Sequence, residues 1–267
     1  MGELIFVGLG LADLDGLTLR AVEAIRNADL AIAEFYTSKV IDLDITQFSK
    51  MVGKNISIVS REEVESGDEI IELAKKRSVC FLTAGDPMAA TTHVDLRLRA
   101  VEKGISTKII HGVSIHTACA SALGLQHYKF GRTVSLPFRE RNYSPSSPYE
   151  HILENRKLGL HTLILLDIKE EENKYMTAAE GVWWLIDAEK KIGKGLINDK
   201  TLICALARIG SRSEKILASY PQIIVQEDMG PPLHTLVLPG KLHFMEARAL
   251  IAFADAPKEI LNDLQMM

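Results

Sequence analysis

The chain has 267 residues, of which 47% are hydrophobic and 25% charged, with 31 basic and 35 acidic residues and a formal net charge of −4. This length suggests two domains or one large domain, and a chain of this size buries enough surface to fold without disulfides or metals. Nucleic-acid-binding proteins usually carry a positive excess, so the acidic balance argues against a nucleic-acid partner.

Three widely separated cysteines, Cys80, Cys119 and Cys204, each lie in an apolar stretch. No pair has metal-ligand spacing, so we expect buried reduced thiols and a reducing compartment. The sequence shows no secretory signal pattern and no run approaching the ~18 apolar residues of a membrane-spanning helix. These features predict a cytoplasmic protein with no membrane partner.

Apolar runs alternate with amphipathic stretches through the first 110 residues. Strands are predicted at 4–7, 30–33, 56–59, 79–82 and 107–110, and helices from 19, from 61 to about 74, and over 92–102. Thr18 is a plausible N-cap, and Ser60 with Glu63 forms a capping box. Alternation of strands and helices predicts an α/β domain with a mainly parallel sheet.

The second half follows a less regular pattern. A helix is predicted over Ser114–Leu123 and a loop over Pro137–Pro148, which is rich in proline and serine. Continuous apolar runs at 162–166, 202–206 and 235–238 predict further strands. Thr177 and Glu180 form a second capping box, and a final helix is predicted over about 242–253. We place a domain boundary near Gly112, which gives domains of residues 1–111 and 112–267.

The first strand ends in Gly8-Leu9-Gly10, which permits a tight turn and close approach by a ligand. A dinucleotide-binding turn needs a third glycine where this chain has Asp13. Glu34, at the end of the second strand, nevertheless stands where a ribose-binding acid would. An NAD(P)-dependent oxidoreductase of the Rossmann type therefore remains an alternative.

Two later strands also end in polar turns. Thr83-Ala84-Gly85-Asp86-Pro87 presents a carboxylate that could accept hydrogen bonds from ribose hydroxyls or form a turn and cap the next helix. In His111–His116, Ser114 could cap the following helix or bind polar groups of a ligand. The two histidines lack metal-pair spacing and no carboxylate accompanies them in sequence, so we expect no metal site.

Other polar residues stand near strand ends in the second half. Asp167 and Lys169 follow one strand, where a solvated ion pair is the default expectation. His234 follows a rigid Pro-Pro turn. The chain has no Gly-x-Ser-x-Gly elbow, P-loop or HExxH helix, which argues against hydrolases, kinases and metalloproteases of those types.

Nine segments together resemble the diphthine synthase family over nearly the whole chain. The segments are residues 5–11 (IFVGLGL), 33–38 (AEFYTS), 60–62 (SRE), 81–93, 127–131 (HYKFG), 159–169, 175–178 (YMTA), 207–211 (ARIGS) and 239–243 (PGKLH). Their joint order is specific although each segment alone is weak. Two departures are Leu11, where the wider group often has proline, and Gly112-Val113, where the family often has Ala-Pro.

The resemblance implies a methyltransferase of the tetrapyrrole methylase-like (class III) type, with two α/β domains and S-adenosyl-L-methionine in the cleft between them. It implies a cytoplasmic homodimer whose protein substrate is elongation factor 2. The amino group of the factor's 3-amino-3-carboxypropyl-histidine would be methylated repeatedly during diphthamide biosynthesis. A tetrapyrrole methylase of the same fold is the second alternative.

The resemblance also implies a set of cofactor-binding positions, most of them at the strand ends described above. They are Leu11, Asp86, Ala89, Ser114, Ile115, Leu166, Ala207 and His234. No catalytic residue follows from the sequence, and Glu34, Tyr36, Asp167 and His234 are candidates for a proton acceptor. The number of methyl groups added and the surface that docks elongation factor 2 stay open.

Overall fold

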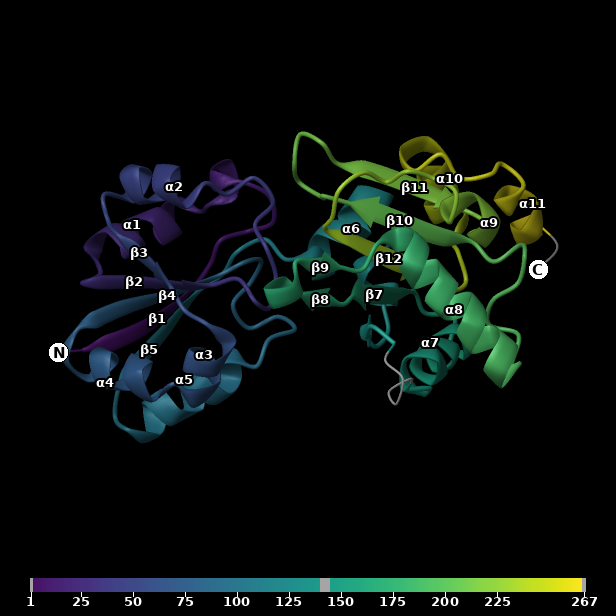
Figure 1. The fold of residues 1–267 in the computed structure, drawn as a ribbon. Helices are drawn as coiled ribbons and strands as arrows, with labels where there is room; N and C mark the ends of the chain where they lie inside the picture. Colours follow the sequence, from purple (N-terminus) through teal and green to yellow (C-terminus); the bar gives the residue numbers. More distant parts are fainter. Residues whose placement is uncertain (1, 140–144, 266–267) are drawn as a thin grey trace. The chain divides into compact units, whose positions relative to one another are not determined.

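The computed structural model describes residues 2–139 and 145–265, which form two compact units that divide between Ile115 and His116 (Figure 1). Unit 1 precedes this division and unit 2 follows it. Each unit contains a five-stranded sheet with packed helices, so the predicted α/β class is confirmed. The sequence-based boundary at 111/112 stays a prediction.

The sheet of unit 1 is entirely parallel, with strand order β3-β2-β4-β1-β5. Its strands are β1 (Glu3–Gly8), β2 (Leu30–Glu34), β3 (Ile56–Ile58), β4 (Ser78–Thr83) and β5 (Ser106–Ile110). Its helices are α1 (Leu19–Asn27), α2 (Ile45–Val52), α3 (Arg61–Ser66), α4 (Asp68–Lys76) and α5 (His93–Glu102), with a short 3₁₀ turn, η1 (Leu14–Gly16). All five predicted strands form, and the prediction of a parallel sheet is confirmed.

Helices cover both faces of this sheet (Figure 1). On one face, Ile25 of α1 packs in a cluster with Val7 of β1, and the same cluster holds residues of α2. On the other face, Leu96 of α5 packs in a cluster with Phe6 of β1, together with residues of α4. Successive residues of β1 therefore serve opposite cores, as a strand buried on both faces requires.

The single helix predicted from 61 to about 74 is wrong: a break at Gly67 divides it into α3 and α4. The capping box of Ser60 and Glu63 does begin α3. Gly67 has φ of +63° and its N–H bonds to the Glu63 carbonyl, which ends α3 in a left-handed cap. Glycine reaches this conformation without strain, and α4 begins at the next residue.

The sheet of unit 2 has the order β11-β10-β12-β7-β6, in which only the β6–β7 pair is parallel. Its strands are β6 (Val134–Leu136), β7 (Thr162–Leu166), β10 (Ile203–Ala207), β11 (Lys215–Ser219) and β12 (His234–Leu238), and β8 (Ile168–Lys169) pairs with β9 (Lys174–Tyr175) in a separate hairpin. Its helices are α6 (Ile115–Leu123), α7 (Ser147–Lys157), α8 (Ala178–Ile192), α9 (Pro221–Ile224), α10 (Phe244–Phe253) and α11 (Ile260–Gln265), with 3₁₀ turns η2 (His127–Lys129) and η3 (Glu170–Glu172).

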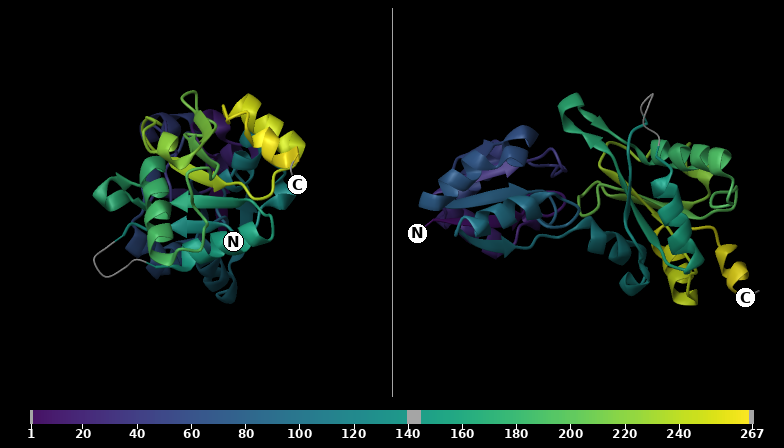
Figure 2. Two further views of the ribbon diagram at one scale, coloured as in Figure 1. Left: turned by 90° about the vertical axis from the view of Figure 1, so that its right-hand side faces the viewer. Right: turned by 90° about the horizontal axis from the view of Figure 1, so that it is seen from below.

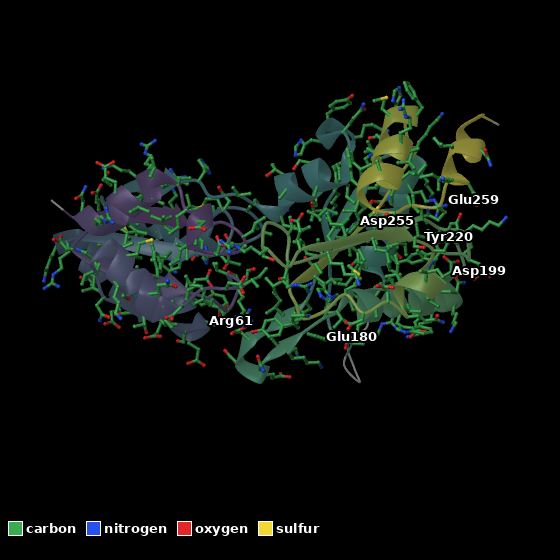
Figure 3. The ribbon with its side chains drawn as sticks, turned by 90° about the horizontal axis from the view of Figure 1, so that it is seen from above. Arg61, Glu180, Asp199, Tyr220, Asp255 and Glu259 are labelled. Atoms are coloured by element: carbon green, nitrogen blue, oxygen red, sulfur yellow. The ribbon has the colours of Figure 1, made fainter. Side chains whose placement is uncertain are left out.

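Both faces of this second sheet are covered. Every residue of β10 and β12 is buried, and α8 (green) and α10 (yellow) lie on opposite sides of the strands in the right-hand view of Figure 2. The predicted capping box begins α8: Glu180 N–H donates to Thr177 Oγ1 at 3.2 Å, and Thr177 N–H donates to Glu180 Oε2 at 2.7 Å. Glu180 is labelled in Figure 3. The predicted start of this helix is therefore confirmed.

The loop predicted over Pro137–Pro148 is partly wrong. Residues 140–144 of this stretch lie outside the described residues. Helix α7 begins at Ser147, inside the predicted loop, with Pro148 in its first turn. Proline is tolerated there because the first N–H groups of a helix have no intrahelical acceptor.

The three cysteines are buried and free, as expected, and burial raises the pKa of the Cys80 and Cys119 thiols to about 12. They are therefore protonated, unreactive core residues at neutral pH. Among the described residues, no helix is both long and apolar enough to span a membrane.

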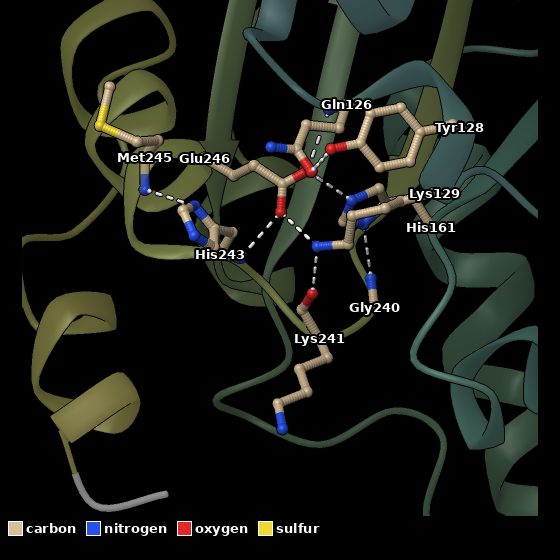
Figure 4. A network of polar contacts seen from close by, with 9 residues as sticks. All are labelled: Gln126, Tyr128, Lys129, His161, Gly240, Lys241, His243, Met245 and Glu246. Carbon is tan, nitrogen blue, oxygen red and sulfur yellow. Dashed lines mark hydrogen bonds and ion pairs between the residues drawn. The ribbon is translucent and has the colours of Figure 1, made fainter.

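A buried carboxylate, Glu246, holds separate segments of unit 2 together (Figure 4). Its Oε1 accepts hydrogen bonds of 3.0 Å from Gln126 N–H and His161 Nε2. Its Oε2 accepts a 2.7 Å bond from His243 N–H and pairs with Lys129 Nζ. The side chain is 1% exposed, so one carboxylate inside the protein links α10, η2 and the residue before β7.

Candidate functional site

Three loops of unit 1 meet at the carboxyl edge of the parallel sheet. They are residues 8–11 after β1, 83–89 after β4 and 110–115 after β5. Leu9 N–H donates to the Thr83 carbonyl at 2.9 Å. Gly10 and Gly85 exchange two backbone hydrogen bonds of 3.2 and 2.7 Å. Backbone pairing therefore continues past the ends of β1 and β4 and fixes these two loops to each other.

Glycines let the third loop approach the other two. A Cβ on Gly112 would lie 2.3 Å from the Gly85 carbonyl oxygen and 2.8 Å from Gly8 C, and one on Gly8 would lie 2.6 Å from Gly112 N. Gly10 and Gly85 also have φ of +78° and +67°. We refer to Gly8, Gly10, Gly85 and Gly112 as the glycine contact; it exists because no Cβ separates the three backbones.

The glycine contact lies at a topological switch point. Adjacent strands β1 and β4 lead to helices on opposite faces of the sheet, α1 and α5. Open α/β sheets bind ligands at the carboxyl ends of such strand pairs. Five of the sequence-predicted cofactor positions lie on these three loops: Leu11, Asp86, Ala89, Ser114 and Ile115.

Asp86 provides a carboxylate at this edge and is held by two contacts. Its Oδ1 accepts a 3.1 Å hydrogen bond from Met88 N–H, which supports the turn as the sequence suggested. Its Oδ2 lies 2.7 Å from His111 Nδ1. No carboxylate stands beside His111 in the sequence, because its partner comes from the end of a different strand. Asp86 is 14% exposed and retains lone pairs for a further donor.

Two features considered for dinucleotide binding have structural roles. Asp13 Oδ1 accepts hydrogen bonds from Asp15 N–H at 3.0 Å and Gly16 N–H at 3.2 Å, and so caps η1. Glu34 is fully buried and accepts bonds from Thr37 Oγ1 at 2.6 Å and from Thr83 Oγ1. A carboxylate enclosed in this way is not presented to a ribose, so the feature that had favoured an oxidoreductase is removed.

The remaining predicted positions, Leu166, His234 and Ala207, lie next to one another on neighbouring strands of unit 2. Ala207, the last residue of β10, pairs with His234, the first residue of β12. Leu166 ends β7 and stands one step beyond the Thr235–Leu165 pair. These residues therefore lie together at the same end of three adjacent strands of the second sheet. The sequence could not show this proximity.

The His234 imidazole uses both ring nitrogens within unit 2. Nδ1 accepts a 3.1 Å hydrogen bond from Ala178 N–H at the start of α8. Nε2 therefore carries the proton and donates to the Pro231 carbonyl at 3.0 Å. Burial lowers the pKa of this histidine and favours the neutral ring. The side chain therefore fixes the start of α8 and the loop that precedes β12.

Arg208, which follows Ala207, was not singled out from the sequence although it stands in the ARIGS segment. It is 6% exposed and has φ of +50°. Its guanidinium donates to the Ser213 and Met229 carbonyls at 2.8–3.0 Å and also contacts the Pro231 carbonyl. The buried guanidinium thus holds the loops that contain Ser213 and Met229 beside the ends of β7, β12 and β10.

The chain matches a family model described as Tetrapyrrole (Corrin/Porphyrin) Methylases over residues 3–219. It is 42% identical to a diphthine synthase of Methanosarcina barkeri, with 98% of this chain and 100% of the relative covered. A diphthine synthase of Methanocaldococcus jannaschii is 45% identical, with 92% and 97% covered. A solved structure described as a diphthine synthase superposes with a TM-score of 0.89 at 36% identity, covering 97% of this chain and 99% of the other.

Fold, strand-end loops and family match define the class: an S-adenosyl-L-methionine-dependent methyltransferase with the tetrapyrrole methylase fold. Within this class, the two relatives named above are both diphthine synthases and match over 98% and 92% of the chain. The chain belongs to the diphthine synthase family. The resemblance inferred from nine sequence segments is thereby confirmed, and the oxidoreductase alternative is not supported.

The residues of the three strand-end loops of unit 1 suit this methyl donor. Loops 8–11, 83–89 and 110–115 contain no lysine or arginine, and Asp86 is their single carboxylate. S-adenosyl-L-methionine carries ribose hydroxyls and a cationic sulfonium, which suit one carboxylate and loops without side-chain cations. When bound, it supplies an electrophilic methyl group. Asp86 could accept hydrogen bonds from the ribose hydroxyls, and the glycine contact allows the ligand to approach the loop backbone closely.

Proposed function

We propose that the substrate is elongation factor 2 and that the chain repeatedly methylates the amino group of its 3-amino-3-carboxypropyl-histidine during diphthamide biosynthesis. The observation that carries this proposal is the 42% identity to a diphthine synthase across 98% of the chain. The positions proposed to bind the cofactor are Leu11, Asp86, Ala89, Ser114, Ile115, Leu166, Ala207 and His234. A homodimer, a cytoplasmic location and domains of 1–111 and 112–267 belong to the same proposal.

The protein's task in this reaction is to hold a neutral amine in line with the methyl group. Orientation can supply roughly 7–11 kcal/mol of the barrier reduction in favourable cases, and the sulfur of the donor is a good leaving group. The loops at the strand ends of each unit are held in place by contacts within that unit, so they can position the reacting groups. The glycine contact orders the loops of unit 1, and Arg208 with His234 orders the loops of unit 2.

Parallel calorimetry with S-adenosylhomocysteine and NADH tests the cofactor class. We expect saturable binding of S-adenosylhomocysteine and no heat from NADH, because Asp13 stands where a dinucleotide-binding turn has its third glycine and Glu34 is buried. Binding of NADH without binding of S-adenosylhomocysteine would contradict the proposal.

Asp86→Ala is expected to weaken S-adenosylhomocysteine binding roughly tenfold to hundredfold, because hydrogen bonds to a charged group contribute about 1.5–3 kcal/mol. The dissociation constant is measured by calorimetry, with circular dichroism to monitor folding. Asp44→Ala is the matched control, since Asp44 caps α2 through Thr46 N–H at 2.8 Å. It should lower stability by about 1 kcal/mol and leave the affinity unchanged. An unchanged affinity in folded Asp86→Ala would remove Asp86 from the proposed site.

A further inference from the structure

His111 and Asp86 form an exposed imidazole–carboxylate pair at the edge of unit 1. Nδ1 of His111 lies 2.7 Å from Oδ2 of Asp86, and the histidine side chain is 74% exposed. An ionised carboxylate only accepts hydrogen bonds, so Nδ1 carries the proton of the neutral ring. Nε2 is then an acceptor, and it has no hydrogen-bond or ion-pair partner among the described residues. A proton acceptor thus faces outward from the loop that bears Ser114.

The candidates named from the sequence lack a comparable free acceptor. Glu34 is fully buried and bound by threonine hydroxyls. Asp167 accepts Phe138 N–H at 2.8 Å and Ile168 N–H at 3.0 Å, so it ties β6 to the end of β7 and does not pair with Lys169 as expected by default. Burial raises the pKa of Tyr36, which keeps its hydroxyl protonated.

His234 has both ring nitrogens bound to backbone. Of the titratable side chains that the structure describes on the strand-end loops of unit 1, His111 is the one that combines exposure, an orienting carboxylate and a free lone pair. This arrangement matches the base and orienting acid of catalytic triads, in which the carboxylate fixes the tautomer and stabilises the charge that the imidazole gains.

We propose that His111, oriented by Asp86, is the general base that removes a proton from the substrate ammonium before each methyl transfer. This inference rests on the proposed function. Nε2 of His111 takes one proton, and the freed electron pair of the amine nitrogen forms a bond to the methyl carbon. The bond from that carbon to sulfur breaks and its electron pair stays on sulfur, giving S-adenosylhomocysteine. His111 then releases the proton to water, so each transfer yields one methylated ammonium, one S-adenosylhomocysteine and one proton.

His111→Asn tests this role because the asparagine amide can still donate to Asp86 but has no basic nitrogen. The amino group of the substrate is mostly protonated at pH 7. We expect kcat at pH 7 to fall at least about tenfold and the deficit to shrink at alkaline pH, as the neutral amine becomes available in solution. His127→Asn, which replaces another exposed imidazole, should leave the pH profile unchanged.

Two measurements separate a base from a structural role. The dissociation constant of S-adenosylhomocysteine should change less than twofold in His111→Asn. Two-bond ¹H–¹⁵N spectra of the wild type at pH 8 should show the neutral ring of His111 protonated at Nδ1, and Asp86→Asn should produce a mixture of tautomers.

A wild-type pH profile in His111→Asn, a parallel loss of cofactor affinity and activity, or an Nε2-protonated ring would each overturn the base role. Absence of methyl transfer by the wild type itself would instead contradict the proposed function, and the tautomer spectra do not depend on that result.

Discussion

Replacing Gly112 with alanine is expected to reduce the affinity for S-adenosylhomocysteine by more than about a hundredfold, through separation of the three loops at the glycine contact. The new Cβ would lie 2.3 Å from the Gly85 carbonyl oxygen, 2.8 Å from Gly8 C and 2.9 Å from Gly10 N. All three are backbone atoms and no side chain can turn away, so the loops themselves must move. Calorimetry gives the affinity and thermal unfolding gives the accompanying loss of stability.

Gly16→Ala is the matched control for this substitution. A Cβ at Gly16 meets nothing within 4 Å, and neither glycine has a positive φ that would strain alanine. The control should therefore bind S-adenosylhomocysteine like the wild type. If Gly112→Ala binds equally well, the close approach of the three loops is not needed for the cofactor.

Glu246→Gln is expected to destabilise unit 2 by about 3 kcal/mol, because it leaves Lys129 without its buried counter-charge. An amide also offers one acceptor oxygen and places an NH₂ donor where the carboxylate accepts from Gln126, His161 and His243. Urea unfolding at neutral pH measures the loss. Glu63→Gln, at an exposed capping carboxylate, should have a far smaller effect, and equal losses in the two variants would exclude a special role for Glu246.

The same network predicts how stability depends on pH. Hydrogen bonds from Lys129, Gln126 and His243 hold the pKa of Glu246 at about 2 against burial, from an ordinary value of 4.5. A carboxyl group whose pKa is lower in the folded state stabilises it above its ordinary pKa, and this contribution is lost as pH falls toward the folded value. The wild type should lose about 3 kcal/mol from this group between about pH 5 and 2, and Glu246→Gln should lack that part of the slope.

The sequence predicts the framework of unit 1 well because its strands are buried on both faces and read as short apolar runs. Cap chemistry located the starts of α1, α3 and α8. It could not show that Gly67 ends α3, because a glycine inside an amphipathic pattern is compatible with either a break or a continuous helix. Helix α2 was missed although Asp44 caps it, and α7 was hidden by the prolines around its start.

The candidate site depends on contacts between strand ends that are distant in sequence. Asp86 and His111 were each noted, but their 2.7 Å contact requires β4 and β5 to end at the same edge of the sheet. The resemblance supplied Ala207 and His234 without showing that they pair across β10 and β12. Arg208 carried no signal of its own, because a buried arginine held by carbonyl groups is indistinguishable in sequence from an exposed one.

Methyl transfer from labelled S-adenosyl-L-methionine to elongation factor 2 tests the central claim most directly. The factor is supplied with and without the 3-amino-3-carboxypropyl arm, each with and without EDTA, and the modified peptide is analysed by mass spectrometry. We expect methyl groups on the amino nitrogen of the arm, no labelling of the unmodified factor and no effect of the chelator. Absence of transfer to the modified factor, or equal labelling of the unmodified one, would contradict this account.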